Sequence, residues 1–325
     1  MIKIAMSLSA SQPGPLWTLM RQCGVEAAVG GIGLRPVPDA PPDEQPWSQA
    51  SLARAKTAYE AGGIPLAVIE SRPPMDKIKL GLPGKEEQLE VVCELIRSMG
   101  ALDIPVWCYD WMPILGVLRT SRTIPTRGGA HVSGYDLDQM EESGPTEFGT
   151  VTEEHQWACL KEFLEHVVPI AEEANVKLAL HPDDPPLTPI RDVARIASSI
   201  ENYQKIIDIV PSQVSGIGLC QGNFTLMTDD LPGAIRHFGE QNKIFFVHFR
   251  DVRGTRENFH EVFHDDGQTD LVACMRAYRD IGYEGVCRPD HYPKMGDEDF
   301  SDDHGLARLF AVGYLKGLRE AVHAE

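Results

Sequence analysis

The chain has 325 residues, of which 42% are hydrophobic and 24% charged, an ordinary globular composition that excludes a disordered or collagen-like protein. Its 48 acidic and 30 basic residues give a formal charge of −18, which repels phosphate backbones and anionic lipid headgroups. We therefore expect neither nucleic acid nor membranes as partners, and we expect an anionic small substrate to need a local cation.

The N-terminal stretch MIKIAMSLSA has no basic lead, and no window reaches the apolar length of a membrane span, so we expect a cytoplasmic protein. The seven cysteines are odd in number and include no CxxC pair. This pattern predicts free thiols and argues against a disulfide framework or a zinc ribbon.

Short apolar runs alternate with longer amphipathic patterns along the chain. In chain order the runs are IKIAM (2–6), VEAAV (25–29), PLAVI (65–69), IPVWCY (104–109), VKLAL (176–180), GIGLC (216–220), KIFFVHF (243–249) and EGVCR (284–288). Between them, residues 86–100, 155–174 and 270–282 carry apolar residues three and four apart, which predicts helices. Eight strand–helix units predict a single α/β domain over residues 1–325, a (β/α)8 (TIM) barrel. No G-x-G-x-x-G follows the first run, which argues against a dinucleotide-binding sheet.

Two segments interrupt this alternation. Residues 34–47 are rich in proline and predict a loop. Residues 112–150 are too long for a plain loop between strand and helix, so we expect an extended loop insertion there. It carries a basic cluster, Arg119, Arg122 and Arg127, and is either a lid or binding loop or a solvated surface segment.

Side chains that can bind metals follow four successive predicted strands. His181 follows VKLAL, Cys220 ends GIGLC, His248 lies near the end of KIFFVHF, and Asp290 follows EGVCRP. Taken singly, each has an ordinary role such as a cap, a buried thiol or a core histidine. Because chemistry in such barrels lies at the C-terminal ends of the strands, we expect the four side chains to meet. Together they suit a divalent first-row metal with positions left open for substrate.

Two further residues beside this set are candidates for the reaction. His291 follows Asp290 directly and is either a general acid or base or a partner that orients Asp290. Arg250 lies two residues past His248, should point to the same face, and either clamps a substrate carboxylate or pairs with a nearby acid.

Three more histidines are weaker candidates. His260 and His264 are four residues apart in a loop-like pattern, but without an H-E-x-x-H signature, and we treat them as substrate contacts. His304 lies in the acidic stretch MGDEDFSDDHG, which is either a solvated turn or a loop that folds toward the site.

Several motifs resemble the mannonate dehydratase family. They are VIESRPPMDKIKLG (68–81), VWCYDWMPILGVLRT (106–120), LALHPDDPP (178–186), GLCQGN (218–223), VHFRDVR with FHEVFHDDG (247–267) and CRPDH (287–291). The resemblance implies a barrel similar to xylose isomerase and a metal-dependent hydro-lyase that converts D-mannonate to 2-keto-3-deoxy-D-gluconate. It also implies Mn²⁺ bound by the four predicted ligands, and a catalytic role for His291. Ligand softness alone would also allow zinc or iron.

Two positions depart from the family pattern. His304 stands where the family has a catalytic tyrosine, and we treat it as a catalytic candidate; Asp110 stands where asparagine is expected. Asp110 and Arg119 are taken as substrate contacts. The alternatives are therefore a dehydratase for another aldonate, a sugar isomerase or epimerase on the same barrel, or a metal-stabilised barrel without turnover. The expected partner is a small sugar acid, and barrels of this kind often form homo-oligomers.

Overall fold

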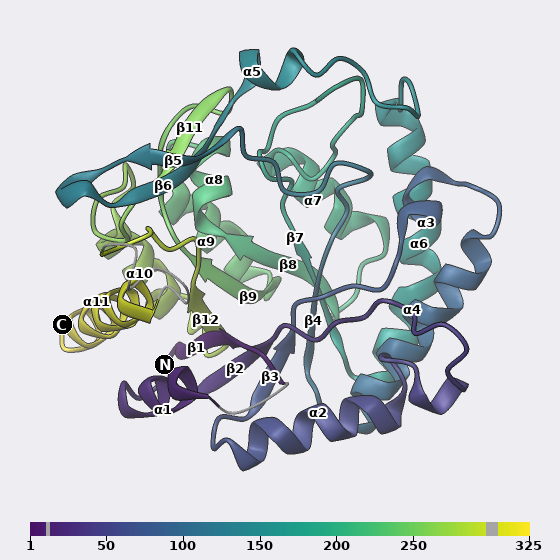
Figure 1. The fold of residues 1–325 in the computed structure, drawn as a ribbon, viewed down its shortest axis with the longest axis horizontal. Coiled ribbons are helices and arrows are strands. Elements are labelled where there is room, and N and C mark those ends of the chain that lie inside the picture. The colour runs from purple at the N-terminus through teal and green to yellow at the C-terminus, as the bar shows by residue number, and fades with distance from the viewer. Residues whose placement is uncertain (11–13, 297–304) are drawn as a thin grey trace.

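The central feature of the computed structural model, which describes residues 1–10, 14–296 and 305–325, is a closed barrel of parallel strands (Figure 1). Around the barrel the order is β1 (Lys3–Leu8), β12 (Val286–Pro289), β9 (Ile244–Phe249), β8 (Ser215–Cys220), β7 (Lys177–His181), β4 (Val106–Asp110), β3 (Leu66–Ile69) and β2 (Ala27–Gly30). Each of the eight runs predicted as a strand forms one of these strands. The (β/α)8 barrel expected from the sequence is therefore confirmed.

Helices cover the outside of the barrel, as Figure 1 shows for α2, α4 and α6. Their bounds are α1 (Pro15–Gln22), α2 (Gln49–Ala61), α3 (Asp76–Leu80), α4 (Lys85–Ala101), α6 (Glu153–Ala174), α7 (Ile200–Ile209), α8 (Gln221–Met227), α9 (Leu231–Glu240), α10 (Leu271–Asp280) and α11 (Gly305–His323), with a short 3-10 helix η1 (Pro42–Glu44). The three amphipathic patterns correspond to α4, α6 and α10. Helix α6 begins at Thr152, whose hydroxyl accepts a hydrogen bond from the His155 amide and so caps the first turn.

The side chains of each barrel strand alternate between two apolar layers. On β7, Leu178 and Leu180 belong to the layer between barrel and helices, whereas Ala179 belongs to a cluster inside the barrel. On β9, Phe246 lies in the same inner cluster. Because successive side chains of a strand point to opposite faces, residues two positions beyond these inner residues also face the barrel axis, at its C-terminal mouth.

The insertion at 112–150 contains regular structure, where the sequence predicts only an extended loop. It holds β5 (Ser121–Pro125), the 3-10 helix η2 (Arg127–Gly129), β6 (His131–Asp136) and α5 (Leu137–Glu141). Strand β6 pairs antiparallel with β11 (Asn258–Glu261), and β11 pairs with β10 (Val252–Gly254), which completes a four-stranded sheet seen at the upper left of Figure 1. The loop prediction for 258–267 is thus wrong for its first four residues, which form β11 between the nearby strand β10 and the distant strand β6.

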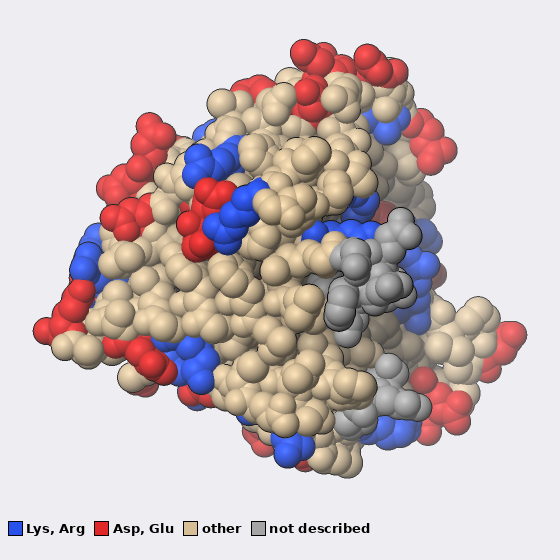
Figure 2. Space-filling view, turned by 60° about the vertical axis from the view of Figure 1, so that its left-hand side comes forward, with Lys and Arg blue, Asp and Glu red and all other residues tan. Residues whose placement is uncertain are grey.

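The surface carries many ion pairs between opposite charges. On the face shown in Figure 2, lysines and arginines lie beside aspartates and glutamates. Arg127 of the predicted basic cluster, for example, pairs with Asp265 at 2.6 Å. Within the described residues, none of the helices combines the length and the apolar character that a bilayer crossing requires.

Candidate metal and active site

Polar side chains from several strands meet at the C-terminal mouth of the barrel. They line a cavity of about 250 Å³, formed by Glu70, Ser71, Arg72, Cys108, Tyr109, Asp110, Met112, Val117, His181, Asp184, His248, Arg288, Asp290 and His291. His181 lies two residues past the inner residue Ala179, and His248 two past Phe246. The same alternation that fills the barrel with apolar side chains therefore aims these histidines into the cavity.

Two histidines face each other across the cavity floor. His181 Nε2 lies 3.1 Å from His248 Nδ1. The other nitrogen of each ring has an oxygen beside it: His181 Nδ1 is 2.7 Å from the Pro182 carbonyl oxygen, and His248 Nε2 forms an ion pair with Glu70 Oε1 at 2.8 Å that lacks hydrogen-bond geometry. A carbonyl or carboxylate partner of this kind fixes the tautomer of a metal-binding histidine. The two facing nitrogens then need a positive charge between them, which a proton or a metal ion can supply.

The cluster also contains a sulfur donor. Cys220 Sγ, His181 and His248 each offer a ligand atom, and these atoms lie within 4.8 Å of one another. Nitrogens bound to one ion at about 2.1 Å would lie about 3 Å apart in neighbouring octahedral positions, which agrees with the spacing of the two histidines. The donor set therefore fits a divalent metal.

Asp290, the fourth predicted ligand, lies beside this cluster. Its Oδ2 is 3.5 Å from His248 Nδ1, and its Oδ1 accepts a hydrogen bond from Arg288 Nη1 at 2.8 Å. Burial alone would raise the pKa of this carboxyl, but Arg288, His291 and His248 hold it well below its usual range. Asp290 is thus ionised and within reach of the ion that the other three donors would hold.

Glu70 and Cys108 form a second donor group with His248. Two observations argue against a metal there. Arg288 donates to both oxygens of Glu70 at 2.8 Å, so that carboxylate is already neutralised. Burial raises the pKa of Cys108 well above its usual range, which keeps the sulfur a protonated thiol. Glu70 instead contacts His248 through Nε2, the ring nitrogen that faces away from His181.

Arg250, which the sequence predicts to clamp a substrate carboxylate, lies outside the cavity lining. All five of its N–H groups are taken: Nε donates to Cys220 Sγ at 3.1 Å, Nη1 to both oxygens of Glu261, and Nη2 to Asp184 and Asn223. The side chain is 1% exposed. Arg250 therefore holds the sulfur of Cys220 in position and has no donor left for a substrate.

Arg119 shares this buried network and likewise does not line the cavity. It donates to both oxygens of Asp184, at 2.6 and 3.1 Å, and contacts Glu261 of β11. Its side chain is only 3% exposed. The guanidinium is thus held by Glu261 of the small sheet and by Asp184 of the loop after β7, at a position where the sequence predicts a substrate contact.

His291 lines the cavity next to Asp290. Its Nε2 lies 3.5 Å from Asp290 Oδ2 and its Nδ1 3.4 Å from Glu261 Oε1, so both ring nitrogens face carboxylates. Its backbone has a φ of 49°, a left-handed conformation that is uncommon outside glycine and concentrates at functional sites. Burial lowers the pKa of His291 despite these carboxylates. The ring thus lies in the cavity wall beside two carboxylates.

The other predicted histidines lie elsewhere. His264 is 1% exposed, packs against Phe249 and Tyr292, and does not line the cavity. His260 sits on β11, half-buried, and is not part of the lining either. Neither position supports the expected substrate contact. His304 lies outside the described residues.

Asp110 does line the cavity, as expected, and it is paired with two cations. Lys79 Nζ donates to its Oδ1 at 2.9 Å, and Arg72 Nη1 lies 2.8 Å from its Oδ2. Burial would raise the pKa of Asp110, but Lys79 and Arg72 lower it. The negative charge expected at this position is therefore balanced inside the protein.

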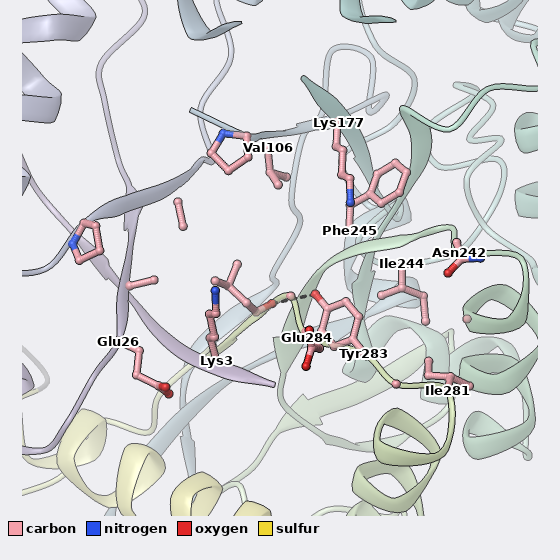
Figure 3. Close-up of a pocket in the computed structure, with 18 residues that line it drawn as sticks. Lys3, Glu26, Val106, Lys177, Asn242, Ile244, Phe245, Ile281, Tyr283 and Glu284 are labelled. Atoms are coloured by element: carbon pink, nitrogen blue, oxygen red, sulfur yellow. Dashed lines mark hydrogen bonds between the residues drawn. The ribbon is translucent and has the colours of Figure 1, made fainter. Parts of the chain in front are cut away.

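A larger cavity of about 510 Å³ lies at the opposite end of the barrel (Figure 3). Lys3, Val106, Lys177 and Ile244, from the N-terminal ends of four strands, lie around it with Glu284. Its lining contains no histidine, cysteine or aspartate. Because the C-terminal mouth carries the reactive groups of such barrels, the smaller cavity is the functional candidate.

Four charged cavity residues were not anticipated from the sequence: Glu70, Arg72, Asp184 and Arg288. A signal existed for Glu70, which directly follows the predicted strand PLAVI, two residues beyond the inner Val68. Arg288 is the last residue of the predicted strand EGVCR and faces the axis for the same reason. Arg72 lies in the following loop, and no local pattern indicates where it points.

The barrel and its polar mouth define a (β/α)8-barrel protein with a donor set suited to a divalent metal. Comparison with known proteins narrows this class. The family model D-mannonate dehydratase (UxuA) matches residues 16–150 and 146–325, and the chain belongs to this family. A mannonate dehydratase of Thermotoga neapolitana is 33% identical over 335 residues, covering 92% of this chain and 91% of that protein.

Solved structures agree with this assignment. The crystal structure of mannonate dehydratase from Streptococcus suis serotype 2 matches with a TM-score of 0.88 and 27% identity, over 100% of this chain and 95% of the other. An L-ribulose 3-epimerase matches with a TM-score of 0.60 and 15% identity, over 100% of this chain and 96% of the other, and shares the fold alone. The resemblance predicted from sequence motifs is therefore confirmed.

Proposed function

We propose that this chain is a cytoplasmic, metal-dependent hydro-lyase that converts D-mannonate to 2-keto-3-deoxy-D-gluconate and water, with the whole chain acting as one catalytic domain. Family membership supports this activity. The observation that carries the proposal is that the donor atoms of His181, Cys220 and His248 lie within 4.8 Å of one another, and that both histidines line one cavity together with Asp290 and His291. Such a cavity offers both a metal site and a group for proton transfer.

The proposed metal ligands are His181, Cys220, His248 and Asp290, and the proposed ion is Mn²⁺. Bound there, a divalent ion would stabilise the negative charge that develops on the substrate carboxylate when the neighbouring carbon loses its proton. The residues around the ligands are arranged to hold them in place: Glu70 and the Pro182 carbonyl fix the two rings, and Arg250 fixes the sulfur.

The reaction removes the proton on C2 and the hydroxyl group on C3, which leave together as water, and the resulting enol takes up a proton at C3 to give the ketone. We assign one proton transfer to His291, because this residue lines the cavity and its ring nitrogens lie beside the carboxylates of Asp290 and Glu261. The departing hydroxyl needs a proton donor, and we keep His304 as the proposed second catalytic residue.

The test is a turnover assay on EDTA-stripped protein with D-mannonate, with and without added Mn²⁺, that follows formation of the 2-keto acid. We expect metal-dependent product, and we expect His291→Asn to lower kcat by at least about 100-fold, the usual contribution of a general acid or base. His166→Asn, an exposed position on α6, is the matched control.

Absence of product from folded, Mn²⁺-loaded protein would reject mannonate as substrate. Other aldonates and aldose–ketose pairs should be assayed in parallel, because product from one of them would identify the alternative dehydratase or isomerase directly. A His291→Asn variant with unchanged kcat would remove His291 from the mechanism.

A further inference from the structure

The cavity needs a positive group for an anionic substrate, and only some of its basic residues can serve. Of the arginines and lysines, Arg72 and Arg288 line it. Arg288 directs Nε and Nη2 to Glu70 and Nη1 to Asp290, and its side chain is 9% exposed. The N–H groups of Arg288 are therefore engaged by the carboxylates of Glu70 and Asp290.

Arg72 differs from Arg288 in exposure and in the number of its partners. Its side chain is 37% exposed, and its ion pair is with one residue, Asp110, through Nη1 at 2.8 Å. The same carboxylate is already paired on its other oxygen with the fully buried Lys79. Arg72 is therefore the cavity guanidinium with an accessible edge, and Asp110 does not depend on it alone for charge balance.

The backbone around Arg72 is held in place. The preceding residue, Ser71, accepts a hydrogen bond at its carbonyl oxygen from the buried indole N–H of Trp107 at 2.8 Å. Arg72 is followed by Pro73 and Pro74, and a residue before proline is restricted to extended conformations. Part of the entropy cost of ordering a substrate-binding arginine is thereby met in the free protein.

We propose that Arg72 binds the carboxylate of the sugar acid and thereby determines the preference for an acid over a neutral sugar. This inference rests on the proposed function and assigns the role that the sequence had suggested for Arg250. A guanidinium with two free N–H groups on one edge matches a carboxylate bidentately. Asp110, whose other oxygen pairs with Lys79, holds one side of the guanidinium through Nη1, and Arg72 lines the cavity.

The experiment measures binding and steady-state kinetics of the Mn²⁺-loaded protein with D-mannonate and with its uncharged amide. We expect Arg72→Gln to weaken D-mannonate binding and raise KM about 10- to 100-fold, the effect of losing a hydrogen bond to a charged group, with kcat changed much less. Binding of the amide should stay the same, and Arg72→Lys should recover part of the affinity for the acid. Arg97→Gln is the control, an exposed arginine with one ion pair at 2.9 Å that does not line the cavity.

A structural role for Arg72 would give different results. If Arg72 serves only to neutralise Asp110, then adding Asp110→Asn to Arg72→Gln should restore the affinity, and that rescue would overturn the proposal. Equal weakening of acid and amide would overturn it too. Wild-type protein that binds D-mannonate through Arg72 without turnover would refute the proposed function and leave the role of Arg72 intact. Normal turnover by Arg72→Gln with an unchanged KM would refute the role of Arg72 and leave the proposed function intact.

Discussion

The ion pairs of Glu70 with Arg288 and His248 allow a quantitative prediction for the stability of the Glu70→Gln variant. Glu70 bridges Arg288 and His248, and its side chain is 22% exposed. Burial alone would raise its pKa, but Arg288 and His248 lower it, so the carboxylate stabilises the folded state. Breaking a buried ion pair costs about 3–5 kcal/mol, and we expect the lower end here because Arg288 keeps Asp290 as a partner.

For a chain of this length, a loss of about 3 kcal/mol corresponds to a decrease of about 4 °C in Tm. The direction of the pKa shift of Glu70 determines how this stabilisation changes with pH. An acid whose pKa is lower in the folded state stabilises it fully above the unfolded-state pKa, and that contribution fades as pH falls toward the folded-state pKa. The Tm difference between wild type and Glu70→Gln should therefore be full at pH 7 and shrink below about pH 4.5.

Thermal unfolding in EDTA at pH 7, 5 and 3.5 measures this difference. The control is Glu60→Gln, which removes an exposed acid paired with Lys56 at 3.6 Å and should change Tm little at any pH. In a separate titration, Glu70→Gln should weaken Mn²⁺ binding about 10- to 100-fold, because His248 loses its orienting carboxylate. A Tm difference that is equally large at pH 7 and pH 3.5 would refute the reasoning.

Two further expectations concern stability. Gly222→Ala would place a Cβ 2.9 Å from Arg250 Cζ, and we expect it to lower the free energy of unfolding in urea by about 1–3 kcal/mol. Gly317→Ala, on an exposed helix face with no atom within 4 Å of the new Cβ, should instead raise the free energy of unfolding by up to about 1 kcal/mol. Equal effects of the two substitutions would contradict the packing argument. Burial raises the pKa of Asp183 to about 6, so ionisation of this carboxyl opposes folding, and the opposition is complete above that pH. We therefore expect Asp183→Asn to be more stable than wild type by up to about 3 kcal/mol at pH 8. This advantage should shrink as the pH falls toward 4. Urea unfolding at the two pH values tests this, and an advantage that is equal at both would exclude ionisation of Asp183 as its cause.

The fold could be predicted from the sequence because its signals are local. Each barrel strand is a short apolar run, and each covering helix has its own amphipathic period, so their order in the chain indicates a barrel before any contact is known. The positions of His181, Cys220 and His248 follow from the same local rule. Each is the last or the second-last residue of a strand, on the side that alternation turns toward the barrel axis, and the structure places their donor atoms together.

The partners of the arginines were decided by tertiary structure alone. Arg250 also follows a strand and would be expected to face the substrate, but β11 brings Glu261 against it, and the loop after β7 brings Asp184. Strand β11 lies between β10, which is close in the sequence, and β6, which is more than a hundred residues away. A guanidinium binds whichever carboxylates the fold brings near it, and those contacts depend on distant segments. The buried pairing of Arg250 and the open edge of Arg72 are therefore properties of the folded chain.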